Sequence, residues 1–358
     1  MRSDVETFCI LQGNTIGEAA RRIDASRLGI VLVVGDQRRL IGTITDGDLR
    51  RAMLAQIALT EPVEVLLERK AGSMYARPIT AFLNDDPATF LRLLQEHNLV
   101  HLPLLNEQDQ VAGLVTLDEF LPAGPTALQA VIMAGGRGLR LHPLTEHVPK
   151  PMLPVGDRPL MEIIIEQLRD FGIKRVSITT HHKGEKIAEH FGDGRDFGVD
   201  IIYVSEDRPL GTAGGLGLLE PPTETMLVIN GDILTQMNFQ AMLAFHRTHA
   251  ADLTVAVRRY DVQVPFGVVE CEGVTVRRIT EKPFLNCFVS AGIYLLEPSV
   301  HRYIRNGESC DMPNLIQRLL EDGRAVVSFP IREYWQDIGQ PFDYEQAQAQ
   351  AKTWKPST

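Results

Sequence analysis

Apolar runs of strand length alternate with helical segments through the second half of the chain. One helical segment is residues 160–171, which place Leu160, Ile164 and Leu168 on one face. The apolar runs of this region are residues 130–134, 175–180, 199–204 and 226–229. This alternation predicts a doubly wound, mostly parallel α/β sheet. The runs at 253–257, 267–270 and 291–296 lie closer together in the chain, which predicts a mixed sheet edge there.

A weaker pattern occurs twice in the first 122 residues. In the first copy a helical segment, 15–27, precedes strands at 30–34 and 40–44 and a new helix from Thr45. The second copy repeats this order at 86–97, 102–105, 111–115 and 116–120. Internal repetition of this kind predicts two units that share a core. We therefore expect repeats at 1–64 and 65–122, a linker at 123–128 with Pro and Gly, and an α/β domain at 129–358.

A glycine cluster directly follows the first strand of the α/β region. Residues 135–138 are Gly-Gly-Arg-Gly, with Arg140 and Lys150 close behind. Glycines leave backbone amides open to an anion, so the segment suits a polyphosphate. The dinucleotide-binding pattern G-x-G-x-x-G is excluded because Leu141 occupies the third glycine position, and no Lys-Ser or Lys-Thr pair completes a P-loop. The cluster predicts a different kind of phosphate site.

Residues 135–151 resemble the signature of nucleoside-diphosphate-sugar pyrophosphorylases, except that Leu139 stands where Thr is usual. Four later segments also resemble this family: 210–215, 281–283, 289–294 and 335–339. The repeats resemble a CBS-domain pair. The resemblance is closest to mannose- and glucosamine-1-phosphate guanylyltransferases, which implies a Rossmann-like nucleotidyltransferase sheet preceded by a CBS pair. It also implies a Mg²⁺-dependent reaction of a nucleoside triphosphate, GTP favoured, with mannose or glucosamine 1-phosphate, for surface or flagellar glycans.

The same resemblance implies a role for each matching residue. Arg140, Lys150 and Asp232 are the expected catalytic residues, and Asp232 and Asp337 the expected Mg²⁺ ligands. The expected nucleotide contacts are Ala134, Gly135, Gly136, Gly138, Arg140, Glu206, Gly211 and Thr212. The expected sugar-phosphate contacts are Lys150, Gly214, Glu281, Lys282, Ser290 and Gly292. Ser290 occupies a position where Asn is common, which leaves the identity of the sugar open.

The chemistry of nucleotidyl transfer agrees with this choice of residues. A sugar phosphate is already anionic at neutral pH, so its attack on the α-phosphorus needs cations rather than a general base. Histidines 181, 182, 246 and 249 accordingly receive no chemical role, and we expect them on a polar helix face or at a strand end. Asp232 follows a buried apolar run and should lie at the carboxyl edge of the sheet. Asn230-Gly231 could instead form a hairpin turn.

The nucleobase and the overall function each leave alternatives. Glu206 could accept both the ring N–H and the amine of guanine, or it could be a solvated loop residue. A uridylyl- or cytidylyltransferase, and a catalytically silent nucleotide sensor, are the competing functions. Arg140, Lys150, Asp232 and Asp337 are all present, which argues against the sensor.

The resemblance of the repeats to CBS domains implies an adenine-nucleotide site. Thr45 and Asp48 match the ligand-facing positions in the first copy, and Thr116 in the second, where Glu119 replaces the usual Asp. The same residue types also cap helices, because their oxygens accept first-turn amide protons. Ligand binding and capping therefore remain alternative interpretations.

Composition adds a few exclusions. The formal charge is −10 and no Lys- or Arg-rich run compensates it, which argues against a nucleic-acid partner. No apolar run is long enough for a membrane span, and the N-terminus lacks signal-peptide character. Four cysteines without metal or disulfide spacing predict reduced thiols in a cytoplasmic protein. Because paired CBS modules often dimerise, we expect a homo-oligomer.

Overall fold

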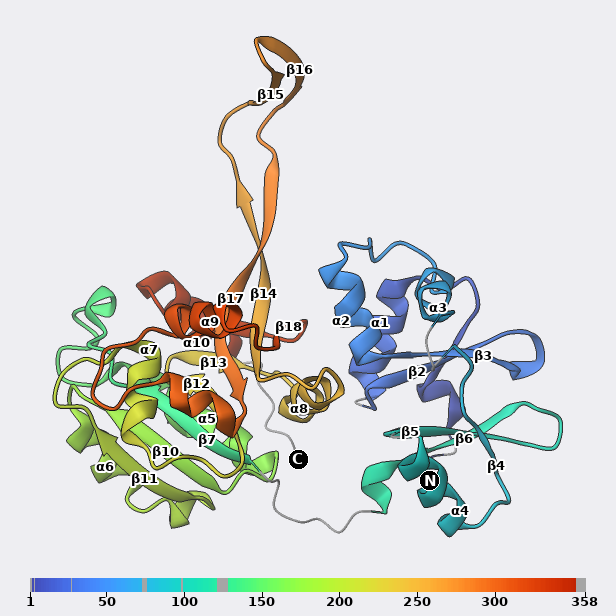
Figure 1. The fold of residues 1–358 in the computed structure, drawn as a ribbon, viewed down its shortest axis with the longest axis horizontal. Coiled ribbons are helices and arrows are strands. Elements are labelled where there is room, and N and C mark those ends of the chain that lie inside the picture. The colour runs from blue at the N-terminus through green and yellow to red at the C-terminus, as the bar shows by residue number, and fades with distance from the viewer. Residues whose placement is uncertain are drawn as a thin grey trace. The chain divides into compact units, whose positions relative to one another are not determined.

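The computed structural model describes residues 2, 4–26, 28–72, 76–97, 99–120 and 128–351. The chain divides into two compact units, residues 1–124 and 125–358 (Figure 1). The predicted linker at 123–128 lies outside the described residues except for Leu128. The predicted limit between the repeats, at 64 and 65, stays a prediction. No helix in the described ranges has the length and apolarity needed to span a bilayer.

The first unit contains two small sheets with the same strand pattern. One has the order β1-β2-β3 and the other β4-β5-β6. Its strands are β1 (Cys9–Leu11), β2 (Ile30–Val34), β3 (Leu40–Thr45), β4 (Ala81–Phe82), β5 (His101–Leu105) and β6 (Val111–Thr116). Its α-helices are α1 (Ile16–Ser26), α2 (Asp46–Leu54), α3 (Glu64–Lys70) and α4 (Pro87–Glu96). Phe8 and Leu32 of the first copy share a buried cluster with Val111 and Leu114 of the second, as the repetition predicts.

The second unit is built on a seven-stranded sheet of order β11-β10-β7-β12-β17-β14-β18. The strands are β7 (Leu128–Ala134), β10 (Arg175–Thr180), β11 (Asp200–Ser205), β12 (Thr225–Asn230), β14 (Leu253–Gln263), β17 (Phe284–Leu296) and β18 (Val326–Pro330). Only β17 is antiparallel to its neighbours β12 and β14. The sheet is therefore mostly parallel, as expected. The antiparallel strand stands inside it, with β14 and β18 beyond.

Apolar residues cover both faces of this sheet. Ile132 of β7 belongs to one core with helix α5, and the neighbouring Val131 faces a second core with helix α9. The helices are α5 (Leu160–Asp170), α6 (Gly184–Phe191), α7 (Gly211–Gly214), α8 (Phe239–Thr248), α9 (Met312–Glu321) and α10 (Pro341–Ala351). Burial on both sides explains the unbroken apolar strands and confirms the doubly wound arrangement.

Two-stranded ribbons complete the second unit. Strand β13 (Ile233–Thr235) pairs with β19 (Trp335–Asp337), and β8 (Pro154–Val155) pairs with β9 (Arg158–Pro159). A third ribbon joins β15 (Val268–Glu272) to β16 (Thr275–Thr280). The prediction that residues 267–270 belong to the main sheet is wrong, since β15 pairs only within its own hairpin. From Val269 to Glu272 apolar and polar residues alternate, which fits a ribbon rather than a buried strand.

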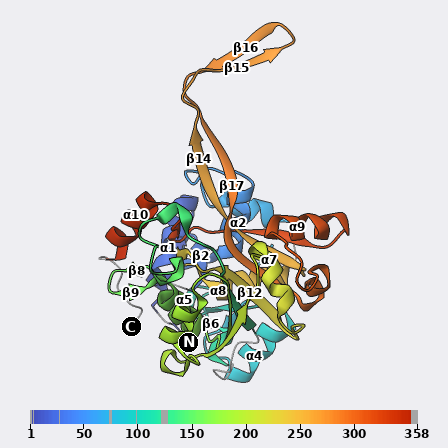
Figure 2. The same ribbon diagram turned by 90° about the vertical axis from the view of Figure 1, so that its left-hand side faces the viewer.

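The outer halves of β14 and β17 extend beyond the main sheet as a long pair of strands. Their pairing continues to Gln263 and Phe284, and the β15–β16 ribbon follows. Figures 1 and 2 show this pair leaving the sheet of the second unit, with a bend before the terminal ribbon. We call residues 258–289 the arm.

Candidate active site

Two neighbouring parallel strands end at the predicted phosphate site. Met133 of β7 pairs with Asn230 of β12, so the residues that follow each strand share one edge of the sheet. The glycine cluster follows β7, and Gly231 and Asp232 follow β12. Ligands of open α/β sheets bind at this carboxyl edge. The hairpin alternative for Asn230-Gly231 is wrong, because the next strand, β13, pairs with β19 instead of β12.

Pairing of β13 with β19 brings two distant carboxylates together. Ile233 lies opposite Asp337, and the Ile338 amide donates to the Asp232 carbonyl at 3.0 Å. The Trp335 indole N–H donates to the Ala291 carbonyl at 2.9 Å, which fixes β19 against β17. Two aspartates more than 100 positions apart therefore meet at one point of the sheet edge.

Lys150 lies between these carboxylates. It begins the short 3-10 helix Lys150–Met152 and is buried, with 9% of its surface exposed. Its Nζ lies 2.5 Å from Asp232 Oδ2 and 3.9 Å from Asp337 Oδ1. Arg140 lies nearby, since a Cβ added to Gly339 would be 3.8 Å from its Nη1. The structure therefore brings the three predicted catalytic residues and both predicted metal ligands together.

Lys150 does not provide a partner for every oxygen atom at this site. Asn230 Oδ1, Asp232 Oδ1 and Asp337 Oδ1 are buried, and within the described residues none has a hydrogen-bond partner. Burial, reinforced by the Asp232 charge, raises the pKa of Asp337 despite Lys150 and Arg140. Buried oxygens of this kind require a cation or a proton donor. Asn230 was not among the predicted site residues. Its position at the end of a buried apolar strand is the signal that could have identified it.

The oxygen atoms fit a hard divalent cation such as Mg²⁺. Mg²⁺ is commonly held by one or two carboxylates, with phosphate oxygens and water as its other ligands. In the described part of the chain no group of three or more His, Cys, Asp or Glu side chains could hold a metal.

The glycine cluster forms the neighbouring wall. Gly138 has φ +64°, and an added Cβ would lie 2.9 Å from Thr145 Cγ2, so only glycine fits well. The Thr145 hydroxyl donates to the Gly138 carbonyl at 2.9 Å. An added Cβ at Gly136 would meet nothing within 4 Å, which leaves that backbone open to a ligand. Ala134 is buried at the end of β7.

Glu206 packs beneath this loop. Only 5% of its surface is exposed, so the alternative of a solvated loop residue is wrong. An added Cβ at Gly135 would lie 3.2 Å from Glu206 Oε1. The Leu210 amide donates to Glu206 Oε2 at 3.0 Å, and burial raises the pKa of this carboxyl. Glu206 therefore joins the glycine cluster to the loop that begins at Leu210.

The glycines of the 210–215 segment pack against the chain before α9. Gly211 has φ +82°, and its Cβ position faces Asp311 Oδ1 at 2.6 Å, while Gly214 faces the Glu308 carbonyl at 2.7 Å. The Thr212 amide donates to Asp311 Oδ1 at 3.1 Å, and its hydroxyl accepts from the Met312 amide at 2.8 Å. These contacts give Gly211, Thr212 and Gly214 a packing role in the structure, and their ligand contacts stay predictions.

The predicted sugar-phosphate residues divide into two groups. Gly292 has φ +70° and faces the Asn230 amide, 2.7 Å from its Cβ position, and Ser290 Oγ lies 2.8 Å from Tyr294 Oη. These residues are on β17 beside the carboxylate centre. Glu281 and Lys282 lie in the arm, past Phe284. The strand from Gly292 to Phe284 is about 26 Å long at about 3.3 Å a residue, so the structure does not bring these two side chains to the centre.

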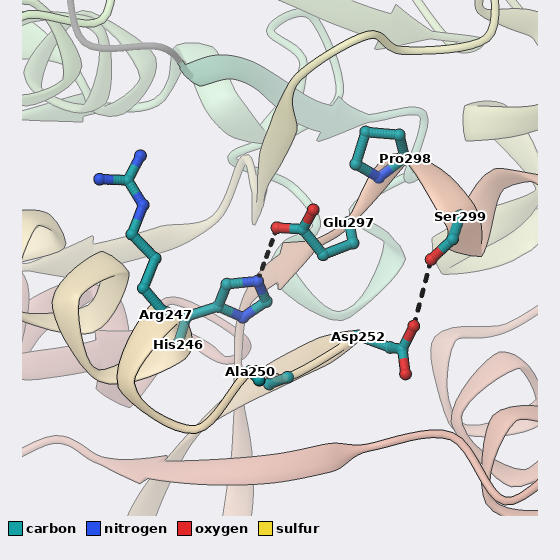
Figure 3. A pocket seen from close by; sticks show the side chains of 8 residues that line it. His246, Arg247, Ala250, Asp252, Glu297, Pro298 and Ser299 are labelled. Carbon is teal, nitrogen blue, oxygen red and sulfur yellow. Dashed lines mark hydrogen bonds and ion pairs between the residues drawn. The ribbon is translucent and has the colours of Figure 1, made fainter.

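The histidines differ in their surroundings. His246 of α8 is buried, with Nδ1 2.7 Å from Thr254 Oγ1 and Nε2 3.0 Å from Glu297 Oε1. Figure 3 shows it beside a pocket that Glu297, Asp252 and Ser299 also line. The expectation of an exposed polar face is wrong for His246, because its carboxylate partner comes from a distant strand end. His181 Nδ1 lies 2.8 Å from the Glu206 carbonyl.

In the first unit both predicted ligand positions form helix caps. The Asp48 amide donates to Thr45 Oγ1 at 3.3 Å, and the Thr45 amide donates to Asp48 Oδ2 at 2.8 Å. Asp48 also pairs with Lys70 at 2.5 Å and Arg51 at 2.7 Å. Although burial raises it, these cations hold the pKa of Asp48 below its usual range. Thr116 and Glu119 form a similar cap. The capping interpretation is confirmed, and a ligand role stays a prediction.

Comparison with known families agrees with this architecture. Residues 129–353 match the nucleotidyl transferase family, and residues 1–55 and 71–124 match the CBS domain. The chain belongs to the nucleotidyl transferase family and carries an N-terminal CBS pair.

Individual relatives lie within the same family. The chain is 34% identical over 230 residues to the mannose-1-phosphate guanylyltransferase of Mycobacterium tuberculosis, covering 62% of this chain and 64% of the relative. It is 32% identical over 245 residues to the UTP–glucose-1-phosphate uridylyltransferase of Synechocystis, covering 62% of each. The chain thus spans less than two thirds of the curated relatives it matches.

A solved structure shares the fold. The putative glucose-1-phosphate thymidylyltransferase of Bacillus anthracis, in complex with a sucrose, has a TM-score of 0.53 and 26% identity. The match covers 64% of this chain and 98% of that chain. The relatives and the solved structure are thus named for three different nucleobases.

Proposed function

We propose that this chain is a Mg²⁺-dependent sugar-1-phosphate nucleotidylyltransferase that converts a nucleoside triphosphate and a sugar 1-phosphate to an NDP-sugar and pyrophosphate. The observation that carries the proposal is the centre of Lys150, Asp232 and Asp337, whose buried carboxylate oxygens lie at the sheet edge beside the open glycine backbone. Cations at such an edge suit a reaction between two anions.

Each group has a place in this reaction. The backbone of residues 135–138 and the Arg140 guanidinium would bind the triphosphate, and Lys150 would neutralise the attacking phosphate. Asp232 and Asp337 would hold Mg²⁺, which when bound supplies charge neutralisation on the phosphates. Fixed cations at contact distance also align the sugar phosphate with the α-phosphorus. No side chain has to take a proton.

We infer that guanine is the favoured base and that mannose or glucosamine 1-phosphate is the acceptor. Support comes from relatives named as mannose-1-phosphate guanylyltransferases. Glu206 is buried and its Oε2 already accepts from the Leu210 amide, so a contact with guanine stays a prediction. The uridylyltransferase relative keeps UTP as the alternative. Ser290 at the sugar wall leaves more room than an Asn would.

Pyrophosphate release tests this proposal directly. The full-length protein is incubated with each of the four nucleoside triphosphates and a panel of sugar 1-phosphates, with Mg²⁺ or with EDTA. We expect turnover that needs Mg²⁺ and is fastest with GTP. Fastest turnover with UTP or CTP would correct the base. No turnover with any pair, from a folded protein that still binds triphosphate, would favour a silent nucleotide sensor.

For the CBS pair we propose an adenine-nucleotide site that tunes the catalytic domain. Support comes from the match of both repeats to the CBS family and from the polar helix starts at Thr45 and Thr116. Such coupling needs a nucleotide that binds two conformations with different affinity. Calorimetry with AMP and ATP on the full chain tests it, and absence of binding would leave these residues as caps alone.

A further inference from the structure

Each ribbon of the arm has one side on which apolar residues predominate. In an antiparallel pair, residues directly opposite each other point to the same side. On one side Val262 lies opposite Leu285 and Tyr260 opposite Cys287, with Arg258 opposite Val289 at its base. The other side is mixed, because Asp261 lies opposite Asn286 but Gln263 lies opposite Phe284. The inner part of the arm therefore has one mostly apolar side.

The terminal ribbon also has a mostly apolar side. Val269 lies opposite Ile279 and Cys271 opposite Val276, whereas Glu270 lies opposite Arg278 on the other side. Exposed fractions of 47% for Val269, 68% for Ile279 and 59% for Val276 show that the structure leaves this face uncovered. A two-stranded ribbon is marginally stable by itself in water, so a face of this kind requires a partner.

Residues between the two ribbons are also unusual. Lys282 has φ +44°, an unfavourable conformation for a side chain with a Cβ, and its amide donates to the Phe266 carbonyl at 3.3 Å. Glu281 packs beside it, since a Cβ added to Gly267 would lie 3.1 Å from its Oε2. The arm thus holds both side chains at its bend, about 26 Å or more from the Gly292 of the same chain.

From these observations we propose that a second copy of this chain covers the apolar face of the arm, and that each arm delivers Glu281 and Lys282 to the carboxylate centre of the other copy. A mostly apolar side on each ribbon suits a two-fold contact in which the same surface serves both subunits. Strands β14 and β17 are paired at ten positions from Leu253 to Gln263. This pairing would have to break for the arm to bend back onto the carboxylate centre of its own chain. The proposal rests on the proposed function for the identity of the ligand, the sugar phosphate.

Mixing two defective full-length variants tests delivery in trans. Asp232→Asn removes a residue of the centre, and Lys282→Ala removes one from the arm. In a mixed dimer, one site then combines an intact centre with an intact arm. If dimers form at random, half are mixed and one site in each is complete, so about a quarter of wild-type turnover should return. A mixture no more active than the separate variants, next to an active wild type, would overturn the proposal.

Self-association has its own measurement. Light scattering should give the mass of a dimer for the wild type. Val262→Asp on the apolar face should give a monomer with unchanged circular dichroism and greatly reduced turnover. The matched control Gln263→Glu, on the opposite side of the same strand, should keep both dimer and turnover. A monomeric wild type, or a Val262→Asp dimer with full turnover, would contradict the proposal.

Crosslinking separates this proposal from the proposed function. In a background with Cys271→Ser and Cys287→Ser, one preparation carries Lys282→Cys and another Ser290→Cys. A short bifunctional maleimide should join the two chains of a mixed dimer. This result would support arm exchange even if no substrate pair is turned over. Absence of a crosslinked dimer in the mixture would overturn it whatever the enzyme does.

Discussion

Two clusters of aspartate and lysine, one in each unit, differ in how their oxygens are satisfied. In the CBS pair, Asp48 accepts from the Thr45 amide and pairs with Lys70 and Arg51. At the sheet edge, Lys150 must serve two carboxylates, and one oxygen each of Asp232 and Asp337 has no hydrogen-bond partner among the described residues. A cluster whose carboxylate oxygens all have partners stabilises the fold. A cluster with unpartnered buried oxygens is a candidate site for a ligand that supplies the missing contacts. The pKa directions agree, lowered at Asp48 and raised at Asp337.

Replacement of Asp232 should give the largest effect. Asp232→Asn keeps the volume but removes one negative ligand, so we expect turnover to fall about 10²- to 10³-fold with the fold intact. Pyrophosphate release at saturating Mg²⁺ measures this. The same substitution at the exposed Asp196 is the control. Near-normal turnover of Asp232→Asn would remove the carboxylate centre from the reaction.

Replacement of Lys150 should destabilise the protein when Mg²⁺ is absent. Lys150→Met leaves two neighbouring carboxylates without their cation, which we expect to cost about 2–3 kcal/mol, less than for a fully buried pair. Urea unfolding in EDTA measures the loss, and Mg²⁺ should restore part of it. Lys174→Met, on the exposed surface, should change little. Equal stability of the two variants would mean that Lys150 does not hold the pair together.

Asp337→Asn should have the opposite effect on stability, because it should stabilise the protein in the absence of metal. The folded-state pKa of Asp337 is raised above its ordinary 3.8, so the folded protein without metal loses stability as pH rises from that value through the raised pKa. The variant avoids this loss, and in EDTA at neutral pH it should melt higher than the wild type. The difference should vanish below pH 3.8.

Added Mg²⁺ supplies the second half of that test. The wild type should gain thermal stability on addition of the ion, and Asp337→Asn should gain less. Turnover of the variant should also fall. A variant that is less stable than the wild type in EDTA at neutral pH would show that the two carboxylates do not repel each other.

The smallest effect is expected at the satisfied cluster. Thr45→Val removes the hydroxyl that caps α2 and should cost about 1 kcal/mol of stability. Thr43→Val, on the adjoining strand β3, is the matched control. Calorimetry of both variants with AMP distinguishes capping from ligand binding. Loss of nucleotide binding in Thr45→Val alone would show that Thr45 binds the nucleotide as well as capping the helix.

Much of this architecture follows from local sequence. The strands β7, β10 and β12 and the helix α5 were predictable because each carries a run or a face of buried apolar residues. The meeting of Lys150 with Asp232 at the sheet edge followed from strand ends and from the family resemblance. These features depend on residues close in sequence or on a repeated topology.

Other features depend on pairings that no local pattern contains. The long extension of β17 from Leu296 to Phe284 places Glu281 and Lys282 in the arm, and nothing in their own segment distinguishes an arm from a sheet edge. Burial of His246 depends on Glu297 and Thr254 from other strands. Burial of Glu206 similarly depends on Gly135 and Gly215, which pack against its carboxylate. Gly135 lies far from it in sequence, and Gly215 lies beyond a turn.

Pairing of β13 with β19 also sets the order in which the centre can form during synthesis. The glycine cluster, Lys150 and Asp232 leave the ribosome long before residues 335–338 do. Domains form progressively as the chain emerges. A nascent chain interrupted near residue 330 would already contain all strands of the main sheet but neither Asp337 nor the strand that brings it to Asp232. The carboxylate pair proposed to hold Mg²⁺ is therefore completed almost last, and an incomplete chain can fold its sheet without that pair.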